Sequence, residues 1–205
     1  MKQLFFQLSP EKRDAIVSAS IAEFGAQEFG SASLERIIAA AGLSTGGLDE
    51  FISSKEDLYI FCVEKTWSSL YRFISEQVSL ARTPLPSDIP ARFKIVSRIA
   101  IEWYLLNPSM LALVVRIVCL PRSVLAKKAE SVFERHFSEL FSGINASHLA
   151  YPLEQLVDLI KCLLAKTRKD VLFGIEAGKS IDEVRQTNLQ QWEFFCSLLS
   201  KGMYR

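Results

Sequence analysis

The segment from Ser33 to Leu58 places the strongest constraint on how this chain folds. It contains a short stretch with apolar residues at i, i+3, i+4 and i+7, then Gly42, a second short stretch, and the start of a longer one. That spacing is typical of one buried helix face. Ser33 and Ser44 can cap the two short helices, and Gly42 can adopt the left-handed conformation of a tight turn. The segment therefore predicts a helix-turn-helix.

Capping residues, prolines and glycines divide the rest of the chain into further helices. We expect helix starts at Ser9-Pro10, Ser33, Ser44, Ser53 (a capping box with Glu56), Asn107-Pro108, Pro121, Tyr151-Pro152 and Ser180, and helix ends at Gly30, Gly42, Ile52, Arg82, Leu106, Ser142 and Gly178. No segment alternates between apolar and polar residues as a strand does. The sequence therefore predicts an all-α fold of about nine helices, with a three-helix head in residues 1–53 and a helical-bundle body in residues 54–205.

The composition is that of an ordinary globular protein. Hydrophobic residues make up 49% of the 205 residues, charged residues make up 23%, and the formal net charge is +1. The N-terminus lacks the apolar segment of a secretory signal, and the most apolar run, residues 110–120, is too short to span a bilayer. The cysteines form no CxxC pair and are expected to be buried thiols: Cys62, Cys119, Cys162 and Cys196. We therefore expect a cytoplasmic protein with no membrane partner.

The sequence lacks the common residue patterns of enzyme active sites. His136 and His148 are the only histidines, and neither has metal-ligand spacing to Cys, Asp or Glu. There is no glycine-rich phosphate loop and no nucleophile elbow. We therefore predict no catalytic residues, no metal and no cofactor.

The helix-turn-helix segment resembles the DNA-binding head of the tetracycline-repressor (TetR) family of transcriptional regulators. The matching residues are Ile37, Ala41, Gly42, Ser44, Gly46, Leu48, Phe51, Ser54, Lys55, Glu56, Asp57 and Leu58. The order of head and body resembles the same family over the whole chain. The resemblance implies a homodimer that binds palindromic double-stranded DNA, and a small-molecule effector in the body that changes the spacing of the two heads.

The resemblance also assigns residues to the DNA. Ser33 and Lys55 would contact phosphates, and Thr45 and Gly47 would face bases or backbone. The complete predicted set is Ser33, Ser44, Thr45, Gly46, Gly47, Asp49, Glu50 and Lys55. The adjacent glycines at 46 and 47 weaken the recognition helix, by about 1 kcal/mol each relative to alanine.

The predicted recognition helix departs from the family pattern in its charge. Thr45 replaces the usual lysine, Gly47 the usual threonine, and Asp49 the usual tyrosine, with Glu50 following. Residues 1–60 contain five basic and nine acidic residues, a net charge of −4, whereas a DNA-binding head is normally basic. Carboxylates near phosphates are repelled, and the favourable release of counterions is lost.

Two interpretations follow from this departure. Carboxylates can accept a hydrogen bond from cytosine N4, and glycine permits close backbone approach, so the head can read an unusual operator. Alternatively, the head keeps its fold without binding DNA, and the chain is a dimeric ligand-binding or scaffold protein.

The body carries an apolar interior that suits a hydrophobic effector. The predicted pocket residues are Trp67, Tyr71, Phe93, Val96, Trp103, Tyr104, Met110, Val114, Arg116, Phe133 and Phe137. Arg116 is the most suggestive, because it interrupts an apolar run and a charge there needs a partner or a route to water. The alternative for each apolar residue is ordinary core packing.

The last two helices carry apolar stripes that suit a four-helix dimer interface. The predicted interface residues are Leu156, Ile160, Leu163, Val171, Gly174, Ile175, Gly178, Trp192, Phe195 and Leu199. The two glycines would let helices of the two protomers approach closely. The alternative is that both stripes are buried within one chain.

Overall fold

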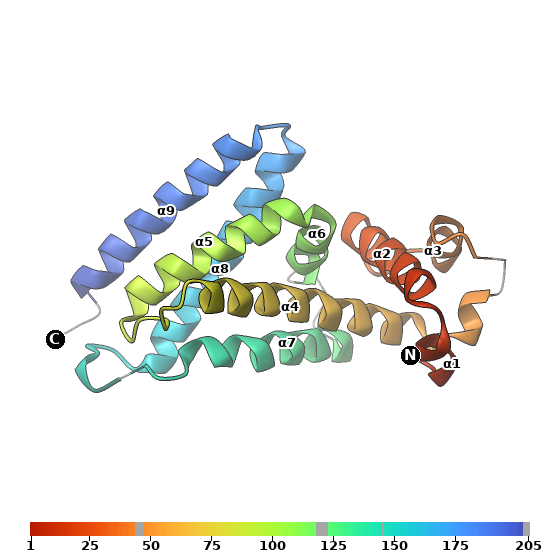
Figure 1. The fold of residues 1–205 in the computed structure, drawn as a ribbon, viewed down its shortest axis with the longest axis horizontal. Coiled ribbons are helices and arrows are strands. Elements are labelled where there is room, and N and C mark those ends of the chain that lie inside the picture. Colours follow the sequence, from red (N-terminus) through yellow and green to blue (C-terminus); the bar gives the residue numbers. More distant parts are fainter. Residues whose placement is uncertain (44–46, 118–122, 145, 203–205) are drawn as a thin grey trace. The chain divides into compact units, whose positions relative to one another are not determined.

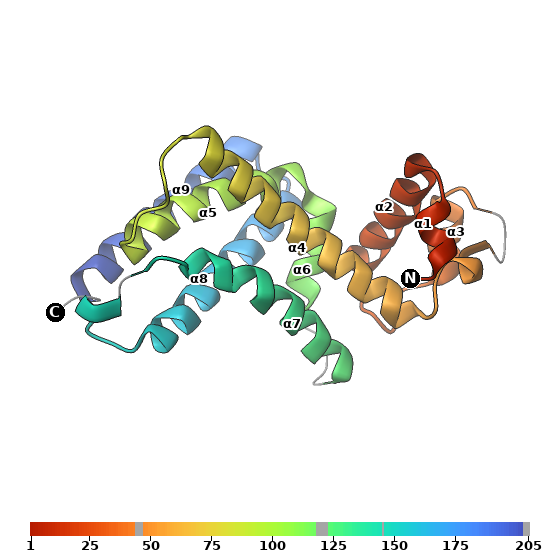
Figure 2. The same ribbon diagram turned by 60° about the horizontal axis from the view of Figure 1, so that its bottom comes forward.

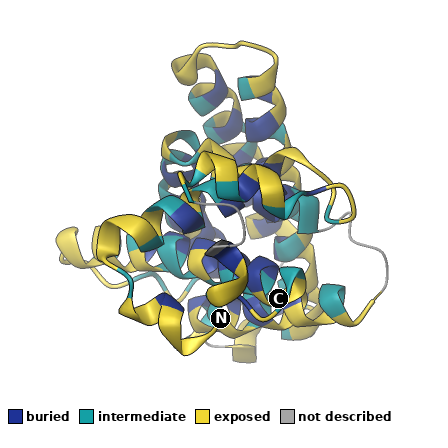
Figure 3. Ribbon diagram, turned by 90° about the vertical axis from the view of Figure 1, so that its right-hand side faces the viewer, coloured by how far each residue is buried: buried dark blue, intermediate teal, exposed yellow. Residues whose placement is uncertain are grey.

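The computed structural model describes residues 1–43, 47–117, 123–144 and 146–202 of the chain. Within these ranges it contains nine α-helices and three short 3₁₀-helices, and no strand (Figure 1). The predicted all-α fold is confirmed. Each helix buries one side and exposes the other, as amphipathic helices around a core do (Figure 3).

The chain packs into two compact units, and each unit combines segments that are distant in sequence. Unit 1 comprises Met1–Ser68 and Ser109–His136, and unit 2 comprises Ser69–Pro108 and Phe137–Arg205. The predicted boundary between head and body at residue 53 is a functional division and stays a prediction.

Unit 1 is built from α1 to α3, the 3₁₀-helix η1, the first half of α4, and most of α6 and α7. These elements are α1 (Gln3–Gln7), α2 (Pro10–Ala26), α3 (Leu34–Ala40), η1 (Gly47–Glu50), α4 (Lys55–Leu80), α6 (Pro108–Ile117) and α7 (Val124–Phe137). Helices α2 and α3 pack against each other (Figure 2). The predicted core positions Ile37, Leu48 and Leu58 have no exposed surface. The helix-turn-helix segment therefore has the core that its sequence requires.

Local start signals are confirmed in unit 1. The Ser9 hydroxyl accepts a hydrogen bond from the Lys12 N–H at 3.4 Å, and the Ser33 hydroxyl accepts one from the Arg36 N–H at 3.2 Å. Gly42 has φ +67°, the left-handed conformation expected at the turn.

Several boundaries differ from expectation. The cap of α4 is Ser54 rather than Ser53, because the Asp57 N–H donates to the Ser54 hydroxyl at 3.0 Å. The helix ends at Leu80, just before Arg82, whose φ of 53° is incompatible with helix. Ser123 caps α7, since its hydroxyl accepts from the Ala126 N–H. The expected start at Pro121 lies outside the described residues, and the α-helix ends at Phe137, continuing only as the 3₁₀-helix η2 (Ser138–Phe141).

The end of α2 has a cause that local sequence does not reveal. The helix stops at Ala26, four residues before Gly30. The Arg116 guanidinium donates to the carbonyl oxygens of Gly25 at 2.5 Å and Ala26 at 2.9 Å. These bonds satisfy carbonyls that a helix end leaves unpaired, and they explain how a charge within an apolar run is stabilised.

Helix α1 was not expected. Phe5 is buried and packs edge-on against Phe61, with ring centroids 5.3 Å apart. The Lys2 N–H donates to the Phe51 carbonyl at 2.8 Å, which ties this end of the chain to the segment after η1. Helix α1 could not be predicted from the sequence for two reasons. Its contacts are with residues far away in the chain, and a helix of five residues has too few apolar positions to show a periodic pattern.

Unit 2 is formed by the second half of α4 and by α5 (Ile89–Leu106), η2, η3 (Ala146–His148), α8 (Leu153–Glu176) and α9 (Ile181–Gly202). Helices α5, α8 and α9 pack against one another (Figure 1). Trp192 of α9 is buried, and its indole N–H donates to the Thr167 hydroxyl of α8 at 2.9 Å. Trp192, one residue of the predicted stripe on α9, is therefore packed within its own chain.

Two properties of the chain as a whole complete this description. Cys62 and Cys196 are buried free thiols, Cys162 is exposed, contrary to expectation, and Cys119 lies outside the described residues. Among the described residues, no single helix is long and apolar enough to cross a membrane; only α5 and α6 taken together, with a bend of 113° between them, reach that length and apolarity.

The packing around the end of α2 can be tested at Gly25. A Cβ there would lie 2.8 Å from the Ser109 carbonyl oxygen, which is backbone and cannot rotate away. Gly25→Ala should lower the free energy of unfolding by about 1–3 kcal/mol in urea denaturation, although alanine favours helix. Gly30→Ala is the matched control, because no atom lies within 4 Å of its added Cβ. Equal effects of the two variants would contradict this packing.

Candidate nucleic-acid interface

The segment after α3 differs most from the predicted recognition helix. We expected an α-helix from Ser44 to Ile52. Residues 44–46 lie outside the described residues, and the described residues 47–50 form the 3₁₀-helix η1 (Gly47–Glu50). Leu48 and Ile52 are buried as expected, which anchors the segment, and Phe51 is half-buried. The low helix propensity of glycine at 47 disfavours an α-helix in η1.

In the part of this segment that the structure describes, acidic side chains are exposed. Asp49 and Glu50 are both exposed, and both lie in the first turn of η1. The predicted DNA-binding residues Ser44, Thr45 and Gly46 lie outside the described residues, and Gly47 begins η1. The exposed described surface of η1 is thus negative, as the sequence predicts.

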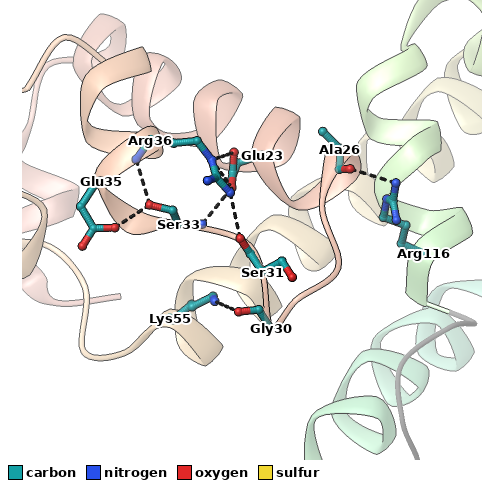
Figure 4. A network of polar contacts seen from close by, with 9 residues as sticks. All are labelled: Glu23, Ala26, Gly30, Ser31, Ser33, Glu35, Arg36, Lys55 and Arg116. Atoms are coloured by element: carbon teal, nitrogen blue, oxygen red, sulfur yellow. Dashed lines mark hydrogen bonds and ion pairs between the residues drawn. The ribbon is translucent and has the colours of Figure 1, made fainter.

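Three basic residues of this region donate to groups within the protein, and Figure 4 shows two of them, Arg36 and Lys55. Arg36 forms a salt bridge to Glu23 at 2.5 Å and donates to the Ser31 carbonyl at 2.8 Å. The Lys55 ammonium donates to the Gly30 carbonyl at 3.4 Å, and the Lys2 ammonium donates to the Asp49 carbonyl at 2.7 Å. Each would have to exchange an internal hydrogen bond for one to a phosphate.

Ser33 is similarly occupied. Besides capping α3, its hydroxyl donates to the Glu35 carboxylate at 2.5 Å, and its backbone N–H donates to Glu23 at 2.8 Å. Glu23 therefore holds the start of α3 by two routes, through Ser33 and through Arg36. Sequence reasoning missed Glu23, because it lies ten residues before Ser33 and only the fold brings them together.

The predicted effector residues divide between the two units and are mostly core. Buried members are Trp67 and Val114 in unit 1, and Phe93, Val96, Trp103, Tyr104 and Phe137 in unit 2; Tyr71, Met110, Arg116 and Phe133 are half-buried. Their role as an effector pocket stays a prediction. Trp67 packs on Phe133 with ring centroids 4.9 Å apart, and Phe93 packs against Phe137 at 6.4 Å.

The predicted interface residues are mostly buried within their own chain. Leu156, Ile160, Val171, Gly174, Trp192 and Leu199 are buried, while Leu163, Ile175 and Phe195 are half-buried. A Cβ at Gly174 would lie 2.8 Å from the Val184 side chain, so this glycine permits close approach of α8 and α9 within the chain. Gly178 has φ +71° and ends α8. The predicted role of both glycines in a dimer interface stays a prediction.

Other apolar residues are exposed on the same two helices. They are Leu159 and Phe173 on α8, and Ile181, Phe194 and Leu198 on α9. A groove of about 280 Å³ runs between the helices and is lined by residues that include Phe173, Thr187 and Gln191. Phe194 and Leu198 follow Gln191 at i+3 and i+7, and Leu159 lies 14 residues before Phe173, so the exposed residues continue the groove along both helices. We call this surface the α8–α9 outer face.

The link between Glu23 and α3 should make stability depend on pH. The hydrogen bonds from Arg36 hold the pKa of Glu23 below its ordinary value of 4.5. The ionised form is therefore favoured by folding, so this contribution is present above about pH 4.5 and is lost as the pH falls further.

Glu23→Gln should lower the free energy of unfolding at neutral pH and flatten the decline of that free energy between about pH 5 and pH 3. Urea denaturation at several pH values measures this. Glu130→Gln, at an exposed carboxylate on α7, should leave the profile unchanged; the same flattening there would contradict the assignment.

Comparison with solved structures shows which proteins share this fold. No family model matches the sequence, and no curated protein matches it. Among solved structures, the chain is similar to a TetR family transcriptional regulator from Chloroflexus aurantiacus J-10-FL, with a TM-score of 0.72, 18% identity, and coverage of 100% of this chain and 98% of that one.

Two further structures extend this similarity. The fatty acid degradation regulator FadR from Bacillus halodurans has a TM-score of 0.66 at 16% identity, covering 86% of this chain and 97% of that one. A TetR-like transcriptional regulator from Rhodococcus sp. RHA1 has a TM-score of 0.59 at 16% identity, covering 88% and 93%. All three are described as regulators and none as an enzyme. The chain has the all-α fold of TetR-family transcriptional regulators.

Proposed function

We propose that this protein is a dimeric transcriptional regulator of the TetR type that responds to a small molecule with an apolar body. The observation that carries the proposal is a fold shared with such regulators over the whole chain, together with an intact helix-turn-helix core at Ile37, Leu48 and Leu58. Fatty acid regulators among the structural neighbours are consistent with a hydrophobic effector. The predicted aromatic residues of the body are the candidate lining for it.

A second candidate function is favoured by the charge of the head. Asp49 and Glu50 are exposed, and Arg36 is paired with Glu23. A chain with this surface would act as a ligand-binding or scaffold protein that does not bind DNA. The two candidates share the fold and differ in one property, which is affinity for duplex DNA.

DNA binding decides between them. Fluorescence anisotropy should compare a duplex from the region upstream of the protein's own coding sequence with a random duplex, at two salt concentrations. A regulator should prefer the upstream duplex and bind it more weakly at high salt. Equal affinity for both duplexes, with little dependence on salt, would favour the second candidate.

The electrostatic obstacle can be tested separately. The double variant Asp49→Asn, Glu50→Gln removes two negative charges from η1 and should strengthen binding to random DNA about fivefold per charge, if each repulsion is about 1 kcal/mol. The matched control is Glu130→Gln with Glu154→Gln, two exposed carboxylates outside the helix-turn-helix. If the control strengthens binding as much, overall charge rather than the position of Asp49 and Glu50 is responsible.

We propose that dimers form through the α8–α9 outer face rather than through the buried stripes. Phe173 and Phe194 have exposed fractions of 59% and 63%, which is large for phenylalanine in a monomer. Two antiparallel helices from each protomer make a four-helix interface with twofold symmetry. The predicted residues Leu163, Ile175 and Phe195 are half-buried and can contribute at its edges.

Substitutions on this face should dissociate the dimer. Phe173→Glu and Phe194→Glu each place a charge in the proposed interface and should shift native mass spectra from dimer to monomer. Leu80→Glu and Leu106→Glu are matched controls, since these leucines are exposed by 74% and 70% and lie outside α8 and α9. A monomeric wild type, or dissociation by the controls, would contradict the proposed interface.

A further inference from the structure

Two ion pairs connect α5 and α9, which pack side by side in unit 2 (Figure 1). The Lys94 ammonium of α5 lies 3.1 Å from the Glu193 carboxylate of α9. Two turns further along α5, both carboxylate oxygens of Glu102 accept hydrogen bonds from the Arg185 guanidinium, at 2.7 and 3.2 Å. The two helices therefore run antiparallel, and the ion pairs fix which turn of α9 lies against which turn of α5.

Arg98 lies on α5 between these two ion pairs. It follows Lys94 by four residues and precedes Glu102 by four, so the three side chains share one side of the helix. On α9, the residue midway between the two members of the ion pairs is Leu189. The antiparallel register therefore sets Arg98 opposite a leucine, whereas the turns before and after it have a base opposite an acid.

The positive charge of Arg98 is not paired within the part of the chain that the structure describes. Its side chain is exposed and makes no hydrogen bond or ion pair with the described residues. The carboxylate one turn away, Glu102, is bonded to Arg185 through both of its oxygens. The other carboxylate of this surface, Glu193, is paired with Lys94. An anion from outside the chain can therefore bind Arg98 without displacing an ion pair.

A groove between α5 and α9 lies at the same position. Its volume is about 400 Å³, which is within the usual range for small-molecule sites. The lining contains two positive charges and one negative charge, so its net charge is +1. The lining residues are Lys94, Arg98, Gln186, Leu189, Gln190, Trp192 and Glu193. We call it the α5–α9 groove.

Two glutamines place further hydrogen-bond donors beside Arg98. Gln186 and Gln190 are one turn apart on α9, and both are exposed and line the groove. Neither side-chain amide is hydrogen-bonded within the described ranges. Each amide NH₂ can donate, and a guanidinium offers two parallel N–H donors that match the two oxygens of a carboxylate. Leu189 lies between these donors and offers an apolar contact.

We propose that the α5–α9 groove binds a small organic acid through its carboxylate group. The carboxylate accepts hydrogen bonds from the Arg98 guanidinium and from the amides of Gln186 and Gln190, and the apolar body of the acid packs against Leu189. A ligand with one negative charge fits the groove best. A second negative charge would be repelled by the carboxylates of the two ion pairs, which lie on either side of Arg98 along the helices.

The α5–α9 groove lies on a different side of α9 from the α8–α9 outer face. Gln186, Gln190 and Glu193 follow one another at i, i+4 and i+7 and so share one side of the helix. Gln191 and Phe194 of the outer face each come one residue after a groove residue, which is a rotation of about 100° around the helix axis. The proposed site therefore depends neither on the proposed dimer interface nor on affinity for DNA.

Titration of the full chain, followed by nuclear magnetic resonance, tests binding at this position. The probes are benzoate, neutral benzamide and inorganic phosphate. Benzoate should shift the side-chain signals of Arg98, Gln186 and Gln190 until they saturate, and it should bind about tenfold more tightly than either other probe. Signals that do not saturate with benzoate at millimolar concentrations, equal affinity for benzamide, or tightest binding of phosphate would each overturn the proposal.

Removal of the arginine locates the site. Arg98→Gln should weaken benzoate binding about tenfold. It should not lower the melting temperature of the free protein, because the guanidinium that it removes bonds to none of the described residues. Arg72→Gln is the matched control, since it removes the same charge from an exposed arginine of α4. Equal weakening by the two variants would overturn the assignment to Arg98.

A carboxylate supplied by the protein should compete with the ligand. Leu189→Glu places an acid opposite Arg98 and should also weaken benzoate binding about tenfold. Leu80→Glu adds the same charge at a leucine that is exposed by 74% on α4 and should leave the affinity unchanged. Unchanged affinity in Leu189→Glu, or an equal loss in Leu80→Glu, would place the anion elsewhere and overturn the proposal.

Discussion

The carboxylate of Glu23 is the interaction on which the helix-turn-helix depends. It accepts hydrogen bonds from the Arg36 guanidinium and from the backbone N–H of Ser33, so that α2 fixes both the start of α3 and its first turn. Only 11% of the Glu23 side chain is exposed. A carboxylate in such a place requires both donors, because burying it without them is costly. The orientation of α3 on α2 is therefore determined by a polar contact as well as by the apolar core.

The same contact has a consequence for DNA recognition. An arginine that holds two helices together does not have its guanidinium free for a phosphate. In the described head, Arg36, Lys55 and Lys2 all donate to groups within the protein. Exposed carboxylates at Asp49 and Glu50 remain on the surface that a DNA-binding head presents. The fold and an affinity for DNA are therefore separate properties. The fold is stabilised by charges that pair within the protein, whereas DNA binding needs positive charges that are free to contact phosphates.

The sequence predicts those features whose causes are local. Ser9 and Ser33 each cap a helix by accepting a hydrogen bond from the backbone N–H three residues later. Gly42 adopts the left-handed conformation of the turn between neighbouring segments. The end of α2 depends instead on Arg116, which is 90 residues from Ala26 in the chain. The sequence around Ala26 therefore does not predict this contact. Glu23 was missed for the same reason.

The interface prediction was limited by a different ambiguity. Helix α8 is apolar on more than one side, so a stripe through Leu156 and Ile160 fits either a core or a dimer contact. Periodicity identifies which residues share a face, but it does not say what covers that face. In the structure both side chains are buried within one chain, and their place in a dimer interface stays a prediction.

The short 3₁₀-helix η1 packs through apolar residues and exposes acidic ones. Leu48 has no exposed surface and Ile52 has 3%, so the segment is anchored through apolar contacts on its inner side. These contacts do not require a full α-helix, since one buried residue per turn is enough to hold a short segment. The outer side is free of that constraint, and the exposed residues Asp49 and Glu50 lie there. The buried residues Leu48 and Ile52 therefore anchor the segment, whereas the exposed residues Asp49 and Glu50 take no part in the core.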